Sequence, residues 1–233
     1  LNIPFLGVNH LEGHLFATMA DNEGIEYPFI CMLVSGGHTQ IWQVNQFGDY
    51  TRLANTIDDA AGEAFDKGAR ILGLGYPGGP EIQKAAKNGS PNKYNFPRPV
   101  IKLSQYDFSF SGLKTAILYQ CKKMDKEVIN KEIHHLAASY QEAIIDTLIN
   151  RLSLVIESTG IKKVSIAGGV AANTRSPRWL GRQRPGPGSL QAGGTTPASG
   201  CFAWPSLHAV LPAPCRTGGR AGRRQTRSAM RGH

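Results

Sequence analysis

The 233-residue sequence lacks paired cysteines, long apolar runs and, in its last third, acidic residues. Its four cysteines are scattered without a Cys-x-x-Cys pair, which argues against a disulfide framework and against a cysteine zinc site. No run of residues has the apolar length that a membrane helix needs, and no secretory leader is apparent. We therefore predict a cytoplasmic protein with no membrane attachment.

Charge is distributed unevenly along the chain. The formal net charge is +9, yet residues 1–174 carry 16 basic and 17 acidic side chains. Residues 175–233 hold ten arginines, no lysine and no acid, together with half of the prolines. This segment shows neither helical nor strand periodicity. We predict a folded core over residues 1–175 and an Arg/Pro/Gly-rich tail, disordered or aberrant, over residues 176–233.

Two explanations of this tail are open. An arginine-rich arm can grip the phosphates of a nucleic acid. Alternatively, the abrupt loss of Lys, Asp and Glu near Arg175 is typical of a change of reading frame. The second explanation is favoured, and the nucleotide sequence beyond the Asn173 codon, translated in all three frames, tests it.

A pair of histidines, His10 and His14, stands out near the start of the chain. In a helix, this spacing puts both imidazoles on one face, where they can bind one divalent ion, with zinc or iron preferred. Glu12 lies one position too late for the zinc-peptidase pattern. A catalytic ion needs a third ligand, expected to be a carboxylate from elsewhere. From the spacing alone, a surface helix that carries two histidines by chance explains the pair equally well.

A glycine-rich turn separates two predicted strands. Phe29–Val34 is a continuous apolar run and Gln40–Val44 alternates, so the two predict a hairpin around Ser35-Gly36-Gly37-His38-Thr39. Glycine N–H groups in such a turn can converge on an anion, and the serine, histidine or threonine can add contacts. An ordinary tight turn is the simpler interpretation.

Helices and a further strand are predicted downstream. Asp58–Lys67 begins like a helix with Asp58 as N-cap, and its Glu63 and Asp66 can meet ribose hydroxyls or remain solvated acids. Pro80 suits the first position of a helix over residues 81–87. Residues 131–158 have the periodicity of one long amphipathic helix or two in series. The strand Lys163–Ala167 then runs into a small-residue turn that ends at Asn173.

Six phrases, in this order, carry a family resemblance. They are Asn9–His14, Leu33–Gln40, Asp58–Lys67, Tyr76–Pro80, Asp107–Thr115 and Ala167–Asn173. Together they resemble the tRNA N6-adenosine threonylcarbamoyltransferases, the family of TsaD (Gcp) and of the catalytic subunit of the KEOPS complex. The resemblance covers residues 1 to about 175. It implies the two-lobed α/β fold of the actin, heat-shock-ATPase and sugar-kinase (ASKHA) superfamily, incomplete here.

The resemblance also implies a reaction and its site. In the family, a threonylcarbamoyl group passes from threonylcarbamoyl-adenylate to N6 of the adenosine next to the anticodon, in tRNAs that read codons beginning with A. His10 and His14 match the ligands of one Fe²⁺ per subunit, with zinc as the alternative metal. The positions that match contacts to the adenylate or ATP are Leu33, Val34, Ser35, Gly36, Gly37, Asp66, Gly79 and Asn173. No protein nucleophile is expected, whereas tRNA and partner subunits of the transfer complex are.

The sequence departs from the family at both ends. The family's first lobe begins before Leu1, and its third metal ligand is an aspartate beyond the Asn173 motif, whereas no acid follows Glu157 here. We therefore predict that the 233-residue chain binds metal weakly and is inactive, which measurable threonylcarbamoylation of tRNA by the purified chain would refute. A non-catalytic nucleotide-binding scaffold subunit remains an alternative, but it would not need the histidine pair. A metallopeptidase is disfavoured by the position of Glu12.

Overall fold

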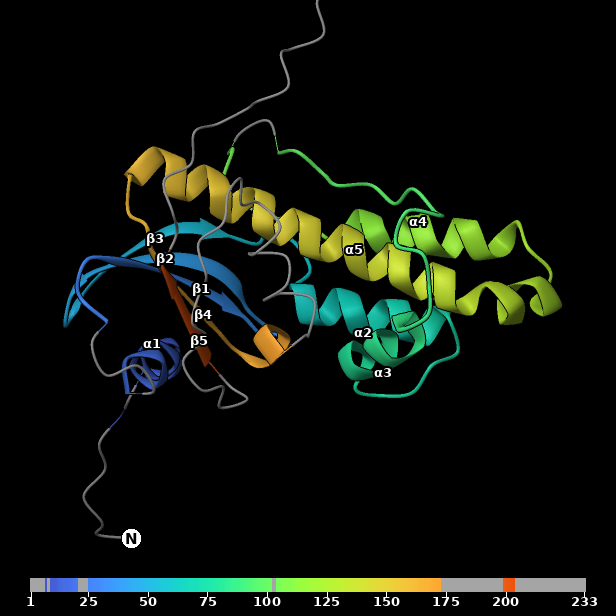
Figure 1. Ribbon diagram of the computed structural model, residues 1–233, viewed down its shortest axis with the longest axis horizontal. Coiled ribbons are helices and arrows are strands. Elements are labelled where there is room, and N and C mark those ends of the chain that lie inside the picture. The colour runs from blue at the N-terminus through green and yellow to red at the C-terminus, as the bar shows by residue number, and fades with distance from the viewer. Residues whose placement is uncertain (1–6, 8, 21–24, 102–103, 173–198, 204–233) are drawn as a thin grey trace, which may run out of the picture.

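A five-stranded mixed sheet forms the centre of the fold (Figure 1). The structure, a computed structural model, describes residues 7, 9–20, 25–101, 104–172 and 199–203. The strands are β1 (Phe29–Val34), β2 (Thr39–Gln46), β3 (Asp49–Asn55), β4 (Lys163–Ala167) and β5 (Ser199–Ala203). Their order across the sheet is β3-β2-β1-β4-β5.

Strand β1 is the middle strand and is buried along its whole length. It pairs antiparallel with β2, with Val34 opposite Thr39, and parallel with β4, with Ile30 opposite Val164. A strand covered on both faces needs apolar side chains on both, which explains the continuous apolar run. The predicted hairpin is therefore confirmed.

Helices cover both faces of the sheet. They are α1 (His10–Ala20), α2 (Ala61–Ile71), α3 (Gly78–Ala86), α4 (Ser111–Lys122) and α5 (Lys126–Thr159), followed by the short 3₁₀ helix η1 (Gly169–Ala172). Because side chains alternate along a strand, Phe29, Cys31 and Leu33 pack in one core with Leu15 of α1. The intervening residues of β1 pack in a second core with α2, α3, α4 and α5. Figure 1 shows α1 apart from the other helices.

Helix α5 covers the segment whose periodicity predicted either one long helix or two in series. It is one helix of 34 residues, not two, and it begins five residues before the predicted start. It packs against α3 and, less extensively, α2 and α4. Tyr140, in its buried middle, donates a hydrogen bond of 2.8 Å from Oη to the carbonyl oxygen of Ala64 in α2. Burial raises the pKa of this phenol, with a smaller contribution from the charge of Asp59.

Two predicted helix starts are wrong. Helix α2 begins at Ala61, and the amide of Ala61 donates a hydrogen bond to Oγ1 of Thr39 at the start of β2, so Asp58 is not its N-cap. Helix α3 begins at Gly78, which places Pro80 third rather than first. Proline is tolerated there because the first helical amides have no partner within the helix.

The segment 176–233 departs from its prediction at one place. Ser199–Ala203 pairs antiparallel with β4, where no strand was expected. Pairing of this kind depends on backbone N–H and C=O groups, which an edge strand offers whatever the side chains are. The predicted disorder of residues 176–198 and 204–233 concerns positions outside the described residues.

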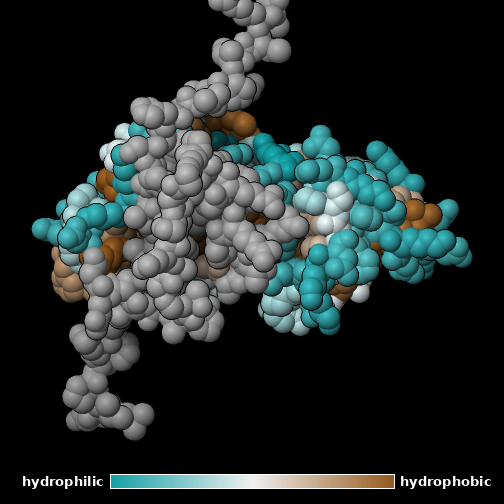
Figure 2. All heavy atoms as spheres, viewed as in Figure 1, coloured by the Kyte–Doolittle hydropathy of each residue, from teal (hydrophilic) through white to brown (hydrophobic). Residues whose placement is uncertain are grey.

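The surface is polar over the helical end of the molecule. Figure 2 shows mainly hydrophilic side chains on this end, on the right of the view. Over the part of the chain that the structure describes, no helix combines the length and the apolar character required to cross a membrane.

Replacing Tyr140 by Phe tests the link between α5 and α2. The variant keeps the buried ring but loses the hydrogen bond to Ala64, so we expect the free energy of unfolding to fall by about 1 kcal/mol in urea titrations. Tyr119→Phe is the matched control, because Tyr119 is 59% exposed and should lose almost nothing. Equal effects in the two variants would contradict this role of Tyr140.

Candidate cation and nucleotide site

The candidate site lies at one edge of the sheet. The parallel strands β1 and β4 both end there, at Val34 and Ala167. The chain continues from β1 into the turn Ser35–His38 and from β4 into Gly168. In open α/β sheets, ligands bind at the carboxyl ends of the strands, where the loops that follow the strands lie.

The turn Ser35–His38 is held by its own hydrogen bonds. The amide of Ser35 donates to the carbonyl of His38 at 2.8 Å, and the amide of His38 donates to Oγ of Ser35 at 3.1 Å. Gly36 and Gly37 are exposed between them, and a Cβ atom on either would meet nothing within 4 Å. Open space therefore lies directly over the backbone of the turn.

The first turn of α2 presses against the same backbone. The amide of Gly62 donates to the carbonyl of Ser35 at 3.3 Å. A Cβ atom on Gly62 would lie 2.6 Å from that oxygen and 2.7 Å from Cα of Gly36, so only glycine permits this approach. Helix N-termini carry a partial positive charge, which favours an anion beside them. The helix start and the glycine turn thus form a single backbone surface.

The two histidines of α1 reach this edge from the other face of the sheet. Asn9 caps the helix, accepting a hydrogen bond on Oδ1 from the amide of Leu11 at 2.9 Å. The rings of His10 and His14 then lie edge to face with centroids 4.7 Å apart. The ring of His10 is also 5.8 Å, centroid to centroid, from that of His38 in the glycine turn. The predicted pair is therefore brought together, and beside the predicted turn.

These imidazoles suit a cation chemically. Among the described residues, their ring nitrogens form no hydrogen bond. The pKa of His14 is lowered by burial and then by the charges of His10 and His38, and the neutral imidazole is the form that binds metal. The described residues contain no group of three metal-binding side chains.

The predicted nucleotide contacts Asp66 and Gly79 also come together. Oδ1 of Asp66 in α2 accepts a hydrogen bond of 2.7 Å from the amide of Gly78, the first residue of α3. Next to this carboxylate is an open hollow of about 320 Å³, lined by Asp66, Arg70, Gly73, Leu74, Gly75 and Tyr76. Glu63 instead forms an ion pair of 2.8 Å with Lys67. Of the two acids considered for ribose, Asp66 is therefore the one beside a cavity.

The remaining predicted positions divide into three kinds. The side chains of Leu33 and Val34 are buried in the two cores, so these residues can offer a ligand only their backbone. Lys114, within the Asp107–Thr115 phrase, could face a phosphate by its position in the sequence or simply open a helix as an exposed lysine, and the structure shows it exposed on α4. Asn173 lies just beyond η1 and outside the described residues.

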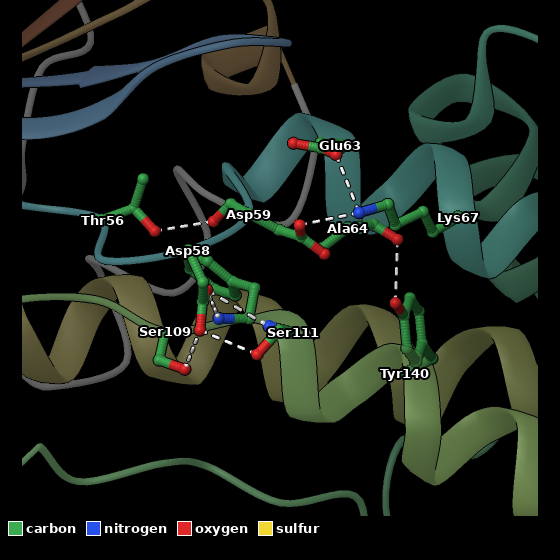
Figure 3. A network of polar contacts seen from close by, with 10 residues as sticks. Thr56, Asp58, Asp59, Glu63, Ala64, Lys67, Ser109, Ser111 and Tyr140 are labelled. Atoms are coloured by element: carbon green, nitrogen blue, oxygen red, sulfur yellow. Dashed lines mark hydrogen bonds and ion pairs between the residues drawn. The ribbon is translucent and has the colours of Figure 1, made fainter.

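Asp58 has a function that sequence reasoning missed. Its carboxylate accepts hydrogen bonds from Oγ of Ser109 at 2.5 Å, from the amide of Phe110 at 2.7 Å, and from the amide and hydroxyl of Ser111 (Figure 3). It therefore fixes the start of α4 to the loop before α2. Burial acts to raise the pKa of Asp58, but the hydrogen bonds outweigh burial and hold it below its usual range. The sequence offered one signal for this role. Ser109-Phe110-Ser111 stands at the start of α4, and the N-cap side chain of that helix accepts no hydrogen bond from its amides, so an acceptor must come from elsewhere.

Beside Asp58, Lys67 joins two acids. Its Nζ lies 2.7 Å from Asp59 and 2.8 Å from Glu63 (Figure 3). The hydrogen bonds with Asp59 and Glu63 raise the pKa of Lys67. This ammonium is therefore engaged in holding α2 and is not available to a phosphate.

The fold has a known relative among solved structures. Full-length HypF, in a phosphate- and nucleotide-bound form, matches 78% of this chain and 38% of its own with a TM-score of 0.56 at 15% sequence identity. The likeness shows that the chain shares the α/β fold of part of HypF, in agreement with the predicted α/β class.

Comparison of sequences defines the family. The TsaD family model, described as tRNA N6-adenosine threonylcarbamoyltransferase, matches residues 1–181. Proteins with this name from Thermosipho africanus and Thermotoga neapolitana are 51% and 50% identical over 75% of this chain. A third, from Syntrophotalea carbinolica, is 37% identical over 93% of this chain and 70% of its own length. The chain belongs to the tRNA N6-adenosine threonylcarbamoyltransferase family, and it spans about half the length of the first two relatives.

The pKa of Asp58 predicts how stability depends on acid. Because this pKa is lower in the folded state than in the unfolded state, the carboxylate stabilises the fold above its ordinary value of 3.8, and the stabilisation is lost as the pH falls through the folded pKa. We expect Asp58→Asn to destabilise the chain at neutral pH and to differ less and less from it below about pH 4. Urea titrations across this range measure the difference, with Asp49→Asn, on an exposed strand end, as control. A difference independent of pH would contradict the assignment.

Proposed function

We propose that this chain carries the cation-binding and adenylate-binding elements of a tRNA threonylcarbamoyl-transfer site. The supporting observation is the approach of the α1 histidines to the glycine turn, with the ring of His10 5.8 Å from that of His38. The substrate is threonylcarbamoyl-adenylate, and the acceptor is N6 of the adenosine next to the anticodon. Family membership supports this reaction, and the relatives bear its name.

His10 and His14 would hold an Fe²⁺ ion, or zinc as the alternative. Their paired imidazoles, free of hydrogen bonds to the described residues, support the assignment. A bound divalent ion supplies Lewis-acid polarisation of a carbonyl or phosphoryl oxygen.

The chain's own groups would position and neutralise the adenylate. Backbone amides of the Gly36-Gly37 turn and the positive end of α2 suit a phosphate that gains charge as it departs. Asp66 can accept hydrogen bonds from ribose hydroxyls beside the hollow that it lines. The attacking group is the adenine amine, so the protein needs no nucleophile of its own, and holding the reactants together is its main contribution.

The proposal extends to partners and location. We expect tRNA and the other subunits of a threonylcarbamoyl-transfer complex to bind this chain or the assembly to which it contributes, in the cytoplasm. Of the alternatives, a scaffold subunit gains no support from a histidine pair beside the turn. A metallopeptidase is disfavoured because the carboxylate of Glu12 accepts a hydrogen bond from Tyr50 at 3.3 Å, on the side of α1 that packs against the sheet.

ATP, as a nucleotide probe, tests the adenylate site. In Asp66→Asn the amide oxygen can still accept the hydrogen bond from Gly78, so the start of α3 is kept, but the charged acceptor for ribose is lost. Hydrogen bonds to charged groups contribute about 1.5–3 kcal/mol. We therefore expect the Kd for ATP, measured by calorimetry, to rise about tenfold or more.

Asp49→Asn is the matched control for this measurement. Asp49 is an exposed aspartate at the start of β3, so its replacement should leave the Kd unchanged. An unchanged Kd in Asp66→Asn as well would remove Asp66 from the site.

A further inference from the structure

We propose that His38 is a third imidazole ligand of the cation site in this chain. The proposed site contains only His10 and His14 from α1, and no acid follows Glu157 in the sequence. His38 comes from a different element, the glycine turn, and its ring lies 5.8 Å from that of His10, centroid to centroid, at an interplanar angle of 47°. The inference rests on the proposed cation site, and the experiment below separates the failure of one from the failure of the other.

The ring separations fit ligands of one ion. With metal–nitrogen distances of about 2.0–2.1 Å and tetrahedral angles, two imidazoles on one ion have centroids roughly 5 Å apart. The observed separations, 4.7 Å for His10–His14 and 5.8 Å for His10–His38, lie on either side of this value. The described side chains do not themselves form a three-ligand cluster, so the proposal requires the imidazole rings to rotate when an ion binds.

The backbone of His38 is well placed to support a ligand. Its amide and its carbonyl are both hydrogen-bonded to Ser35, and the next residue, Thr39, begins β2. The side chain is only half-buried, and its ring forms no hydrogen bond with the described residues, so it keeps rotational freedom. Because its backbone is held in place while its imidazole ring can rotate, His38 can turn a ring nitrogen toward a bound ion.

Other candidate ligands in the described part of the chain are engaged elsewhere. Glu12 accepts the hydrogen bond from Tyr50. On α5, Nδ1 of His134 lies 2.8 Å from the carbonyl of Ala85, and Nδ1 of His135 accepts a hydrogen bond from the amide of Ser90. His38 is thus the group that combines proximity with an open nitrogen.

Three neutral imidazoles would give the site a particular chemistry. They would leave the full charge of a bound divalent ion uncompensated by the protein, as three histidines do in catalytic zinc sites. Such an ion favours an anionic fourth ligand. The phosphate of an adenylate, or inorganic phosphate, has this chemistry.

Cobalt(II), added alone to the purified chain, tests the assignment. Its visible absorption reports the number and type of ligands, and its titration gives a Kd. We expect His38→Ala to weaken cobalt binding at least about tenfold and to change the visible spectrum. His135→Gln, a histidine variant on α5, should change neither. Circular dichroism and thermal unfolding establish that each variant is folded.

His38→Cys gives a signature that a structural role of His38 would not produce. A thiolate bound to cobalt adds a charge-transfer band in the near ultraviolet, which we expect in this variant above the level of the unsubstituted chain with its own four cysteines. Thr51→Cys, exposed on β3, is the matched control and should add no such band.

The outcomes separate the two proposals. If His10→Ala leaves cobalt binding unchanged, the proposed cation site itself is wrong. If His10→Ala abolishes binding, while His38→Ala binds normally and His38→Cys shows no thiolate band, only the assignment of His38 fails. Loss of affinity in His38→Ala together with the new band in His38→Cys supports the three-imidazole site.

Discussion

The structure depends on the close packing of backbone against backbone where β1 ends. Strand β1 is buried on both faces, yet the chain leaves it as a turn whose glycines are exposed. The change is possible because Gly62 of α2 lies against Ser35 and Gly36 with no side chain between them. Gly168, with φ 98°, comes equally close to Val34 from the end of β4. A Cβ atom at either glycine would push its element away from the turn and open the site.

The alternation of side chains along β1 explains how two helices from different faces reach the same turn. Odd-numbered residues of the strand pack with α1, and even-numbered residues pack with α2 and the helices that follow it. Since both cores are anchored on one strand, α1 and α2 are fixed relative to its end. The histidines of α1 and the start of α2 therefore approach the turn from opposite faces of the sheet. The sequence of either helix alone does not determine this arrangement.

Periodicity and turn chemistry predicted the local elements but not their partners. The hairpin and the helical character of residues 131–158 depend on neighbouring residues, and both were predicted from the sequence, although one helix and two in series could not be told apart. The start of α2 was missed because the acceptor of its first amide, Thr39, lies 22 positions earlier, and Asp58 accepts hydrogen bonds from the start of a helix more than 50 positions later. Strand β3 has one fully buried residue, Ala54, among polar and partly exposed neighbours, so it lacks the apolar alternation that marks a strand. The contact between His38 and His10 joins elements on two faces, and no local pattern encodes it.

The glycine turn touches both helices, which makes it the natural place for their coupling. Through His38 it contacts α1, and through Ser35 and Gly36 it contacts the start of α2. The turn is closed by the hydrogen bonds between Ser35 and His38, so its backbone is held between the two helices. Under the proposed function, the cation and the adenylate would therefore share one turn, even though their protein contacts come from opposite faces of the sheet.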